Sequence, residues 1–173
     1  MKITYVTNVR MPTHKAHGIQ MIKMCEAFAK VGANVTFFVP MRHNSIKEDP
    51  FEYYGVERNF TIRYLPSIDV IRFIPKFGFL LQEFTFTLSV LGRFLFASRK
   101  TRIFYTREYY LASLARFLGF TVVYEGHQVP RRSQLFFRFL QAVKIIITNS
   151  EGVAREFREH GFARVLTFPN GID

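Results

Sequence analysis

From residue 103 onward, short apolar runs rich in β-branched residues alternate with helical patterns at a regular spacing. Glycines at positions 119 and 161 end two of these helical patterns. Strands followed by helices at this spacing are typical of a parallel sheet with helices on both faces. Strands are predicted at 103–106, 121–125, 144–148 and 163–168, and helices at 109–118, 132–143 and 151–160.

The first hundred residues fit the same scheme. The apolar run at 2–7 predicts a strand, Asn34–Pro40 a second strand after a helix stop at Gly32, and 60–65 a third. Residues 42–59 are polar and predict a long loop. The predicted fold class is therefore α/β. We expect a single domain with a Rossmann-like, mostly parallel sheet of about seven strands and helices on both faces, which suits 173 residues.

The helix predicted at about 79–98 is apolar on two sides. One stripe should face the sheet, and Phe79, Phe86 and Val90 lie nearly opposite to it. Either neighbours cover both sides, or one side is offered to a lipid surface or a partner, next to Arg99 and Lys100. The stripe predicted to face the sheet consists of Phe77, Leu81, Phe84, Leu88, Leu91 and Leu95.

The chain is strongly basic. It has 24 Lys and Arg against 13 Asp and Glu, a net charge of +11. This charge favours an anionic partner, either a phosphate-bearing ligand, an acidic lipid surface or nucleic acid. The aromatic residues lie at core spacing and are not interleaved with basic ones, so nucleic acid is not expected.

Cysteine and hydropathy patterns favour a cytoplasmic protein. Cys25 is the single cysteine of the sequence, so an internal disulfide cannot form and a reducing compartment is expected. No uncharged apolar run reaches the roughly 18 residues of a membrane span. The apolar run at 3–9 is interrupted by Asn8 and followed by Arg10, which is unlike a secretion signal.

Several common active-site signatures are missing. The sequence has no Gly-x-Gly-x-x-Gly fingerprint of dinucleotide sites, no P-loop, and no Gly-x-Ser-x-Gly of serine hydrolases. His14 and His17 have no carboxylate or cysteine at ligand spacing, so no metal site is expected.

Gly18 opens a helix directly after the first strand and its polar loop. Free N–H groups and the positive end of the helix dipole make such a position suitable for phosphate, here beside His14, Lys15 and His17. The alternative is that Gly18 only relieves a tight entry into the helix.

Polar residues follow nearly every predicted strand. In open parallel sheets, ligands gather at the carboxyl ends of the strands, so these residues form the candidate site. His127 follows Gly126, where a sharp turn can aim the imidazole inward to bond a sugar hydroxyl or phosphate. The alternative is a loop histidine bonded to neighbouring backbone. The candidate residues after the later strands are Arg107, Glu108, Glu125, His127, Asn149 and Ser150.

At these positions the chain resembles a known family. The ending Asn170-Gly171-Ile172-Asp173, the pair Ser150-Glu151 and the first loop, 12–20, resemble the retaining glycosyltransferases of family 4, which have the two-domain B-type fold. The resemblance covers the whole chain in order. It implies that residues 1–173 are the N-terminal, acceptor-binding domain and that the C-terminal nucleotide-sugar domain is absent.

The resemblance also implies a reaction. The intact enzyme would transfer a sugar from a UDP- or GDP-sugar to a hydroxyl acceptor, with no metal or other cofactor, and this half alone would be nearly inactive. The acceptor would be a sugar or a lipid-linked saccharide, with an anionic one favoured by the charge. The expected location is the cytoplasm, with peripheral contact at the inner face of the membrane as an open option.

Residue roles follow from the same resemblance. His127 would be catalytic at the reacting sugar, and Gly18, with His17 beside it, would approach the donor phosphate. The other candidate residues, Arg107, Glu108, Glu125, Asn149 and Ser150, would bind substrate. The alternative function is a non-catalytic Rossmann-like module that binds an anionic membrane surface or nucleic acid.

Overall fold

The structure is a computed structural model that describes residues 1–97, 102–129 and 134–168. The chain forms two compact units, residues 1–101 and 102–173, and each is considered by itself.

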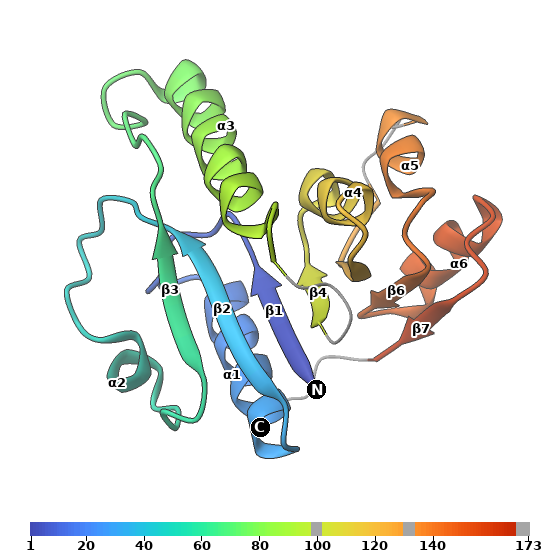
Figure 1. Ribbon diagram of the computed structural model, residues 1–173, viewed down its shortest axis with the longest axis horizontal. Helices are drawn as coiled ribbons and strands as arrows, with labels where there is room; N and C mark the ends of the chain where they lie inside the picture. Colours follow the sequence, from blue (N-terminus) through green and yellow to red (C-terminus); the bar gives the residue numbers. More distant parts are fainter. Residues whose placement is uncertain (98–101, 130–133, 169–173) are drawn as a thin grey trace. The chain divides into compact units, whose positions relative to one another are not determined.

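The first unit has three parallel strands in the order β3-β2-β1, whose arrows point the same way in Figure 1. Val6 of β1 lies opposite Phe38 of β2, which in turn lies opposite Arg63 of β3. The elements are β1 (Lys2–Val6), α1 (Ala16–Lys30), β2 (Asn34–Pro40), α2 (Pro50–Tyr54), β3 (Thr61–Leu65) and α3 (Pro75–Phe94).

Both faces of this three-stranded sheet are covered. Neighbouring side chains of a strand point to opposite faces, and the successive residues Phe37 and Phe38 are both buried. Phe37 contacts Tyr5 on one face, and Phe38 contacts Phe94 of α3 on the other, with ring centroids 5.1 and 5.2 Å apart. Helix α1, drawn behind β2 in Figure 1, buries Cys25 and its apolar neighbours.

The second unit has four parallel strands in the order β4-β5-β6-β7. Residues 122–125 of β5 are all buried, so both faces of this strand are covered as well. Phe136 and Phe157 contact each other and Tyr124. The elements are β4 (Arg102–Thr106), α4 (Tyr109–Phe117), β5 (Thr121–Gly126), α5 (Gln134–Leu140), β6 (Ile145–Thr148), α6 (Glu151–Glu159) and β7 (Val165–Thr167).

These observations confirm the predicted fold class. Seven strands occur in the described part of the chain, every pairing inside each unit is parallel, and helices alternate with strands. The helix stops are also confirmed, because Gly32, Gly119 and Gly161 have φ angles of 86°, 85° and 87°. This left-handed conformation strongly favours glycine at the end of a helix.

The predicted loop at 42–59 was wrong in part, because it contains the short helix α2. Pro50 occupies the first helical position, where its missing N–H costs nothing. The Asp49 carboxylate accepts a hydrogen bond from the N–H of Phe51 (2.9 Å), and Gly55 ends the helix with a φ of 62°.

The prediction for α3 was wrong in its bounds and in its buried side. The helix begins at Pro75 instead of 79 and ends at Phe94. Its buried side carries Gly78, Gln82, Phe86, Val90 and Phe94, whereas much of the predicted stripe is exposed. Both sides are apolar, so periodicity cannot choose between them. Phe94 on the observed side contacts Phe38 of the sheet, and Gly78 on the same side lies against the turn before the helix, where a Cβ would be 2.8 Å from the backbone of Ile71.

Candidate functional site

A buried carboxylate organises the carboxyl ends of β4 and β5 in the second unit. Glu125 is only 4% exposed. Its Oε2 accepts a hydrogen bond from the Tyr105 hydroxyl (2.8 Å), and its Oε1 accepts from Arg107 Nη2 (2.6 Å) and pairs with His127 Nε2 (2.7 Å). Three predicted site residues, Arg107, Glu125 and His127, are therefore brought together.

This network holds Glu125 ionised. Burial by itself would raise the pKa of the carboxyl group, but the hydrogen bonds from His127 and Arg107, the charge of Arg107 and the Tyr105 hydroxyl lower that pKa to about 2. A carboxylate oxygen can only accept hydrogen bonds, so Nε2 of His127 must carry the proton in this pair. Glu125 thereby positions both the guanidinium and the imidazole.

His127 is part-exposed, with 27% of its side chain accessible, while its Nε2 is held by Glu125. The bond to Glu125 leaves Nδ1 as the ring nitrogen that can meet a ligand. In the neutral ring Nδ1 accepts a hydrogen bond from a hydroxyl, and in the protonated ring it donates one. The alternative, a loop histidine bonded to neighbouring backbone, is not what the structure shows, because His127 pairs with the Glu125 side chain.

The other candidate residues of the second unit lie at the same edge. Glu108 is the N-cap of α4, and its N–H donates to Thr106 Oγ1 (3.1 Å). Ser150 caps α6, because its hydroxyl accepts a hydrogen bond from the N–H of Val153 (3.4 Å). Asn149 precedes Ser150, and its buried Oδ1 accepts no hydrogen bond from the described residues. Ser150 thus has a structural role, and its predicted contact with substrate stays a prediction.

The first unit carries Gly18 in the first turn of α1. Its N–H donates to the carbonyl of Lys15 (2.9 Å), and its Cα is covered by Thr13 and Tyr54. The Tyr54 hydroxyl donates to the Thr13 carbonyl (2.8 Å) and accepts from the Thr13 N–H (2.7 Å). This packing matches the alternative in which Gly18 relieves a tight helix entry, and its approach to a donor phosphate stays a prediction.

Replacing Gly18 with alanine is expected to destabilise the protein by about 1–3 kcal/mol, the usual cost of overpacking a filled site. The new Cβ would lie 2.5 Å from a Tyr54 hydroxyl held by two hydrogen bonds to Thr13. Urea denaturation measures the loss. Gly92→Ala in α3 is the matched control, since nothing lies within 4 Å of its Cβ. Equal stability of both variants would contradict the packing role.

The remaining residues of the first loop are held within the first unit. His17 lies in the first turn of α1, and the neighbouring His14 pairs through Nδ1 with the Tyr53 hydroxyl (2.7 Å). Among the described residues, no group of three or more His, Cys, Asp or Glu is arranged to hold a metal ion.

Sequence reasoning missed two groups at the strand ends. Gln82 of α3 is fully buried, and its Nε2 donates to Oδ1 of Asn8, just after β1 (2.8 Å). The sequence signal that could have indicated Gln82 is a polar amide residue inside an otherwise apolar helical pattern. Tyr105 was also missed, because its position inside β4 suggested only core packing.

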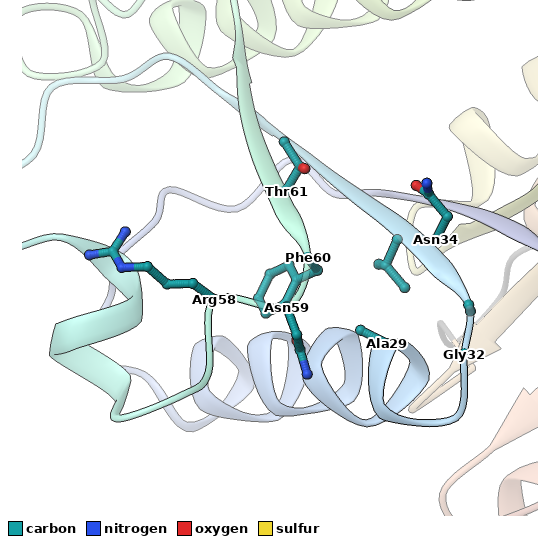
Figure 2. A pocket seen from close by; sticks show the side chains of 9 residues that line it. Ala29, Gly32, Asn34, Arg58, Asn59, Phe60 and Thr61 are labelled. Carbon is teal, nitrogen blue, oxygen red and sulfur yellow. The ribbon is translucent and has the colours of Figure 1, made fainter.

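A hollow of about 440 Å³ in the first unit lies at the opposite ends of the strands, where β2 and β3 begin (Figure 2). None of the predicted site residues lines it. The charge of Arg58, which lines it, is already paired, because Arg58 forms salt bridges with Asp49 (2.9 Å) and Glu52 (3.1 Å) in α2 and its cap. We therefore place the candidate site at the carboxyl ends and not in this hollow.

Comparison with known proteins identifies the family. The model of Glycosyltransferase Family 4 matches residues 18–173. A search of curated proteins finds no match. Residues 169–173, whose sequence carries part of the family resemblance, lie outside the described residues.

Solved structures show the same fold at low sequence identity. Phytolacca americana UGT2, complexed with UDP-2-fluoro-glucose and pterostilbene, has a TM-score of 0.67 and 12% identity, over 99% of this chain and 54% of its own. The lipopolysaccharide outer core galactosyltransferase WaaB in its apo form has a TM-score of 0.63 and 12% identity, over 100% and 46%. An E. coli structure described as trehalose-6-phosphate bound with UDP-2-fluoro glucose has a TM-score of 0.59 and 11% identity, over 100% of this chain and 49% of its own. The chain thus spans about half the length of these proteins.

Proposed function

Because this chain belongs to glycosyltransferase family 4, we propose that residues 1–173 are the acceptor-binding half of a retaining, nucleotide-sugar-dependent glycosyltransferase. The donor, a UDP- or GDP-sugar, would be held mainly by a second domain of the enzyme. In the complete enzyme the anomeric carbon exchanges its bond to the nucleoside diphosphate for a bond to an acceptor hydroxyl oxygen. The hydroxyl proton leaves with the departing diphosphate or to solvent.

The observation that carries this proposal is the network of Arg107, Glu125 and His127. It lies at the carboxyl ends of parallel strands, where ligands of open sheets bind. A buried, ionised Glu125 that fixes an imidazole and a guanidinium is more than the packing of a sheet requires.

Each member of the network has a role in the proposal. His127 bonds a hydroxyl of the reacting sugar through Nδ1, while Glu125 holds the ring by Nε2. Arg107, fixed by the same carboxylate, attracts an anionic acceptor such as a phosphorylated sugar or a lipid-linked saccharide. Glu108, Asn149 and Ser150 shape the acceptor side, and His17 and Gly18 face the donor phosphate. No metal or other cofactor takes part.

The non-catalytic alternative and the nucleic-acid partner gain no support from the family match or from the neighbours. We propose a cytoplasmic location, with peripheral contact at the inner face of the membrane as an open option.

A transfer assay tests the proposal. Residues 1–173 alone should release no UDP or GDP from UDP- or GDP-sugars offered with sugar-phosphate acceptors. Residues 1–173 combined with a family 4 nucleotide-sugar domain, either fused to it or added as a separate chain, should release one of them. NMR of the product should show the anomeric configuration of the donor. Turnover by residues 1–173 alone would contradict the half-enzyme assignment, and an inverted product would contradict the retaining mechanism.

A further inference from the structure

The outward side of α3 is apolar along its whole length. Phe77, Leu80 and Phe84 are 61%, 62% and 61% exposed, and Leu88 and Leu95 are exposed by 48% and 41%. They recur every three, four or seven residues, so they share one side of the helix, which we name the outer face of α3. The opposite side packs on the sheet through Phe38 and its neighbours.

No charged residue interrupts the outer face. At about 100° per residue, Lys76, Glu83 and Arg93 all lie about 100° or more around the helix from Phe77. The apolar surface continues beyond both ends of the helix, because Phe73 is 80% and Phe96 is 92% exposed. Surface helices of soluble proteins carry polar residues on this side, and large apolar patches usually mark an interaction site.

Cations lie near both ends of α3. Arg72 and Lys76 are exposed at the beginning of α3 and Arg93 near its end, and Arg99 and Lys100 follow in the sequence. Few acidic residues near α3 offset this positive charge. Glu83 is the single acidic residue of α3, and Asp69 already pairs with Arg42 (3.4 Å).

This charge pattern indicates which kind of partner covers the outer face of α3. Two copies of the chain meeting through their outer faces would bring the same cations together, which is unfavourable. An anionic lipid surface offers acyl chains to the phenylalanines and phosphates to the cations. No helix among the described residues is long and apolar enough to cross a bilayer. The opposite side of α3 is packed on the sheet, so the helix would lie in the plane of the membrane.

We propose that α3 docks the protein on an anionic membrane surface, with its outer face among the acyl chains and with Arg72 and Lys76, at the beginning of the helix, at the headgroups. The 20 residues of α3 extend about 30 Å, which gives a long line of contact (Figure 1). The buried side of α3 stays on the sheet, so docking needs no unfolding. This property is separate from sugar transfer and is measured without it.

Co-sedimentation with vesicles tests the proposal. The chain should bind vesicles of phosphatidylcholine with 30% phosphatidylglycerol at least about 10-fold more strongly than pure phosphatidylcholine, and added salt should weaken this binding. Phe84→Ser should reduce binding to the anionic vesicles about 10-fold or more, because a phenylalanine side chain no longer enters the lipid. Phe117→Ser in α4 is the matched control, since Phe117 is 89% exposed but distant in sequence from α3, and it should bind as the parent does.

Both variants should fold as the parent does, because neither removes a buried side chain. Thermal unfolding verifies this. Equal and negligible binding of the parent to the two kinds of vesicle would overturn the proposal, as would parental binding by Phe84→Ser. A third outcome would also overturn it. If the parent is a dimer in analytical ultracentrifugation, binds no vesicles, and becomes a monomer on Phe84→Ser, a second copy covers the outer face.

Discussion

Replacing His127 with alanine is expected to lower the transfer rate of the complete enzyme about 10²-fold or more, the usual contribution of a positioned acid–base or hydrogen-bonding side chain. The imidazole is held by Glu125 at 2.7 Å, so its orientation is fixed before a sugar arrives. Alanine would remove the proposed Nδ1 contact with the sugar and would leave the sheet intact. Steady-state kinetics with the nucleotide sugar should show the loss mainly in kcat, if the contact is strongest in the transition state.

His43→Ala is the matched control for this experiment. The imidazole of His43 makes no hydrogen bond with the described residues, although its backbone N–H donates to Asp69 (3.1 Å). This variant should retain the parental kcat and thermal stability. Near-normal turnover of His127→Ala would remove His127 from the chemistry, whatever the family resemblance implies.

Replacing Glu125 with glutamine is expected to lower the free energy of unfolding by about 3–5 kcal/mol, as when one partner of a buried ion pair is removed. Arg107 has only 12% of its side chain exposed, and its charge would lose its carboxylate. The amide also presents N–H groups where Glu125 offers only acceptors to three donors. Urea denaturation at neutral pH measures the difference.

The same carboxylate makes stability depend on acidity. Its pKa is lowered from 4.5 to about 2, so the folded state favours the ionised form. This contribution is present in full above pH 4.5 and is lost as the pH falls through the folded pKa. It amounts to about 3 kcal/mol, at about 1.4 kcal/mol per unit of pKa. Between pH 4.5 and 2, Glu125→Gln should show a shallower loss of stability than the parent.

Glu159→Gln is the control for both measurements on Glu125. Glu159 is an exposed residue of α6, where a change of charge has little effect on stability. Its unfolding curves should follow those of the parent at each pH. If Glu125→Gln also follows the parent, the buried network does not stabilise the second unit.

Much of the candidate site could be predicted because of a local rule. Each strand ends where its apolar run gives way to polar residues, and parallel pairing places those ends at one edge. Arg107, Glu125 and His127 were thereby grouped, and the structure links them directly. The rule could not show that Glu125 is buried or that Tyr105 donates to it. Whether a side chain at a strand end is buried depends on how the neighbouring strands and helices pack around it.

The sequence by itself determined the α/β class, the strands and the helix stops at Gly32, Gly119 and Gly161, because these depend on local patterns and on backbone conformations that favour glycine. Only the tertiary structure decided which side of α3 is buried. Two apolar sides satisfy the same periodicity, and the choice depends on the packing of Phe94 against Phe38 of the sheet. Local chemistry fixes the elements, and packing between distant segments decides what each element shows to solvent.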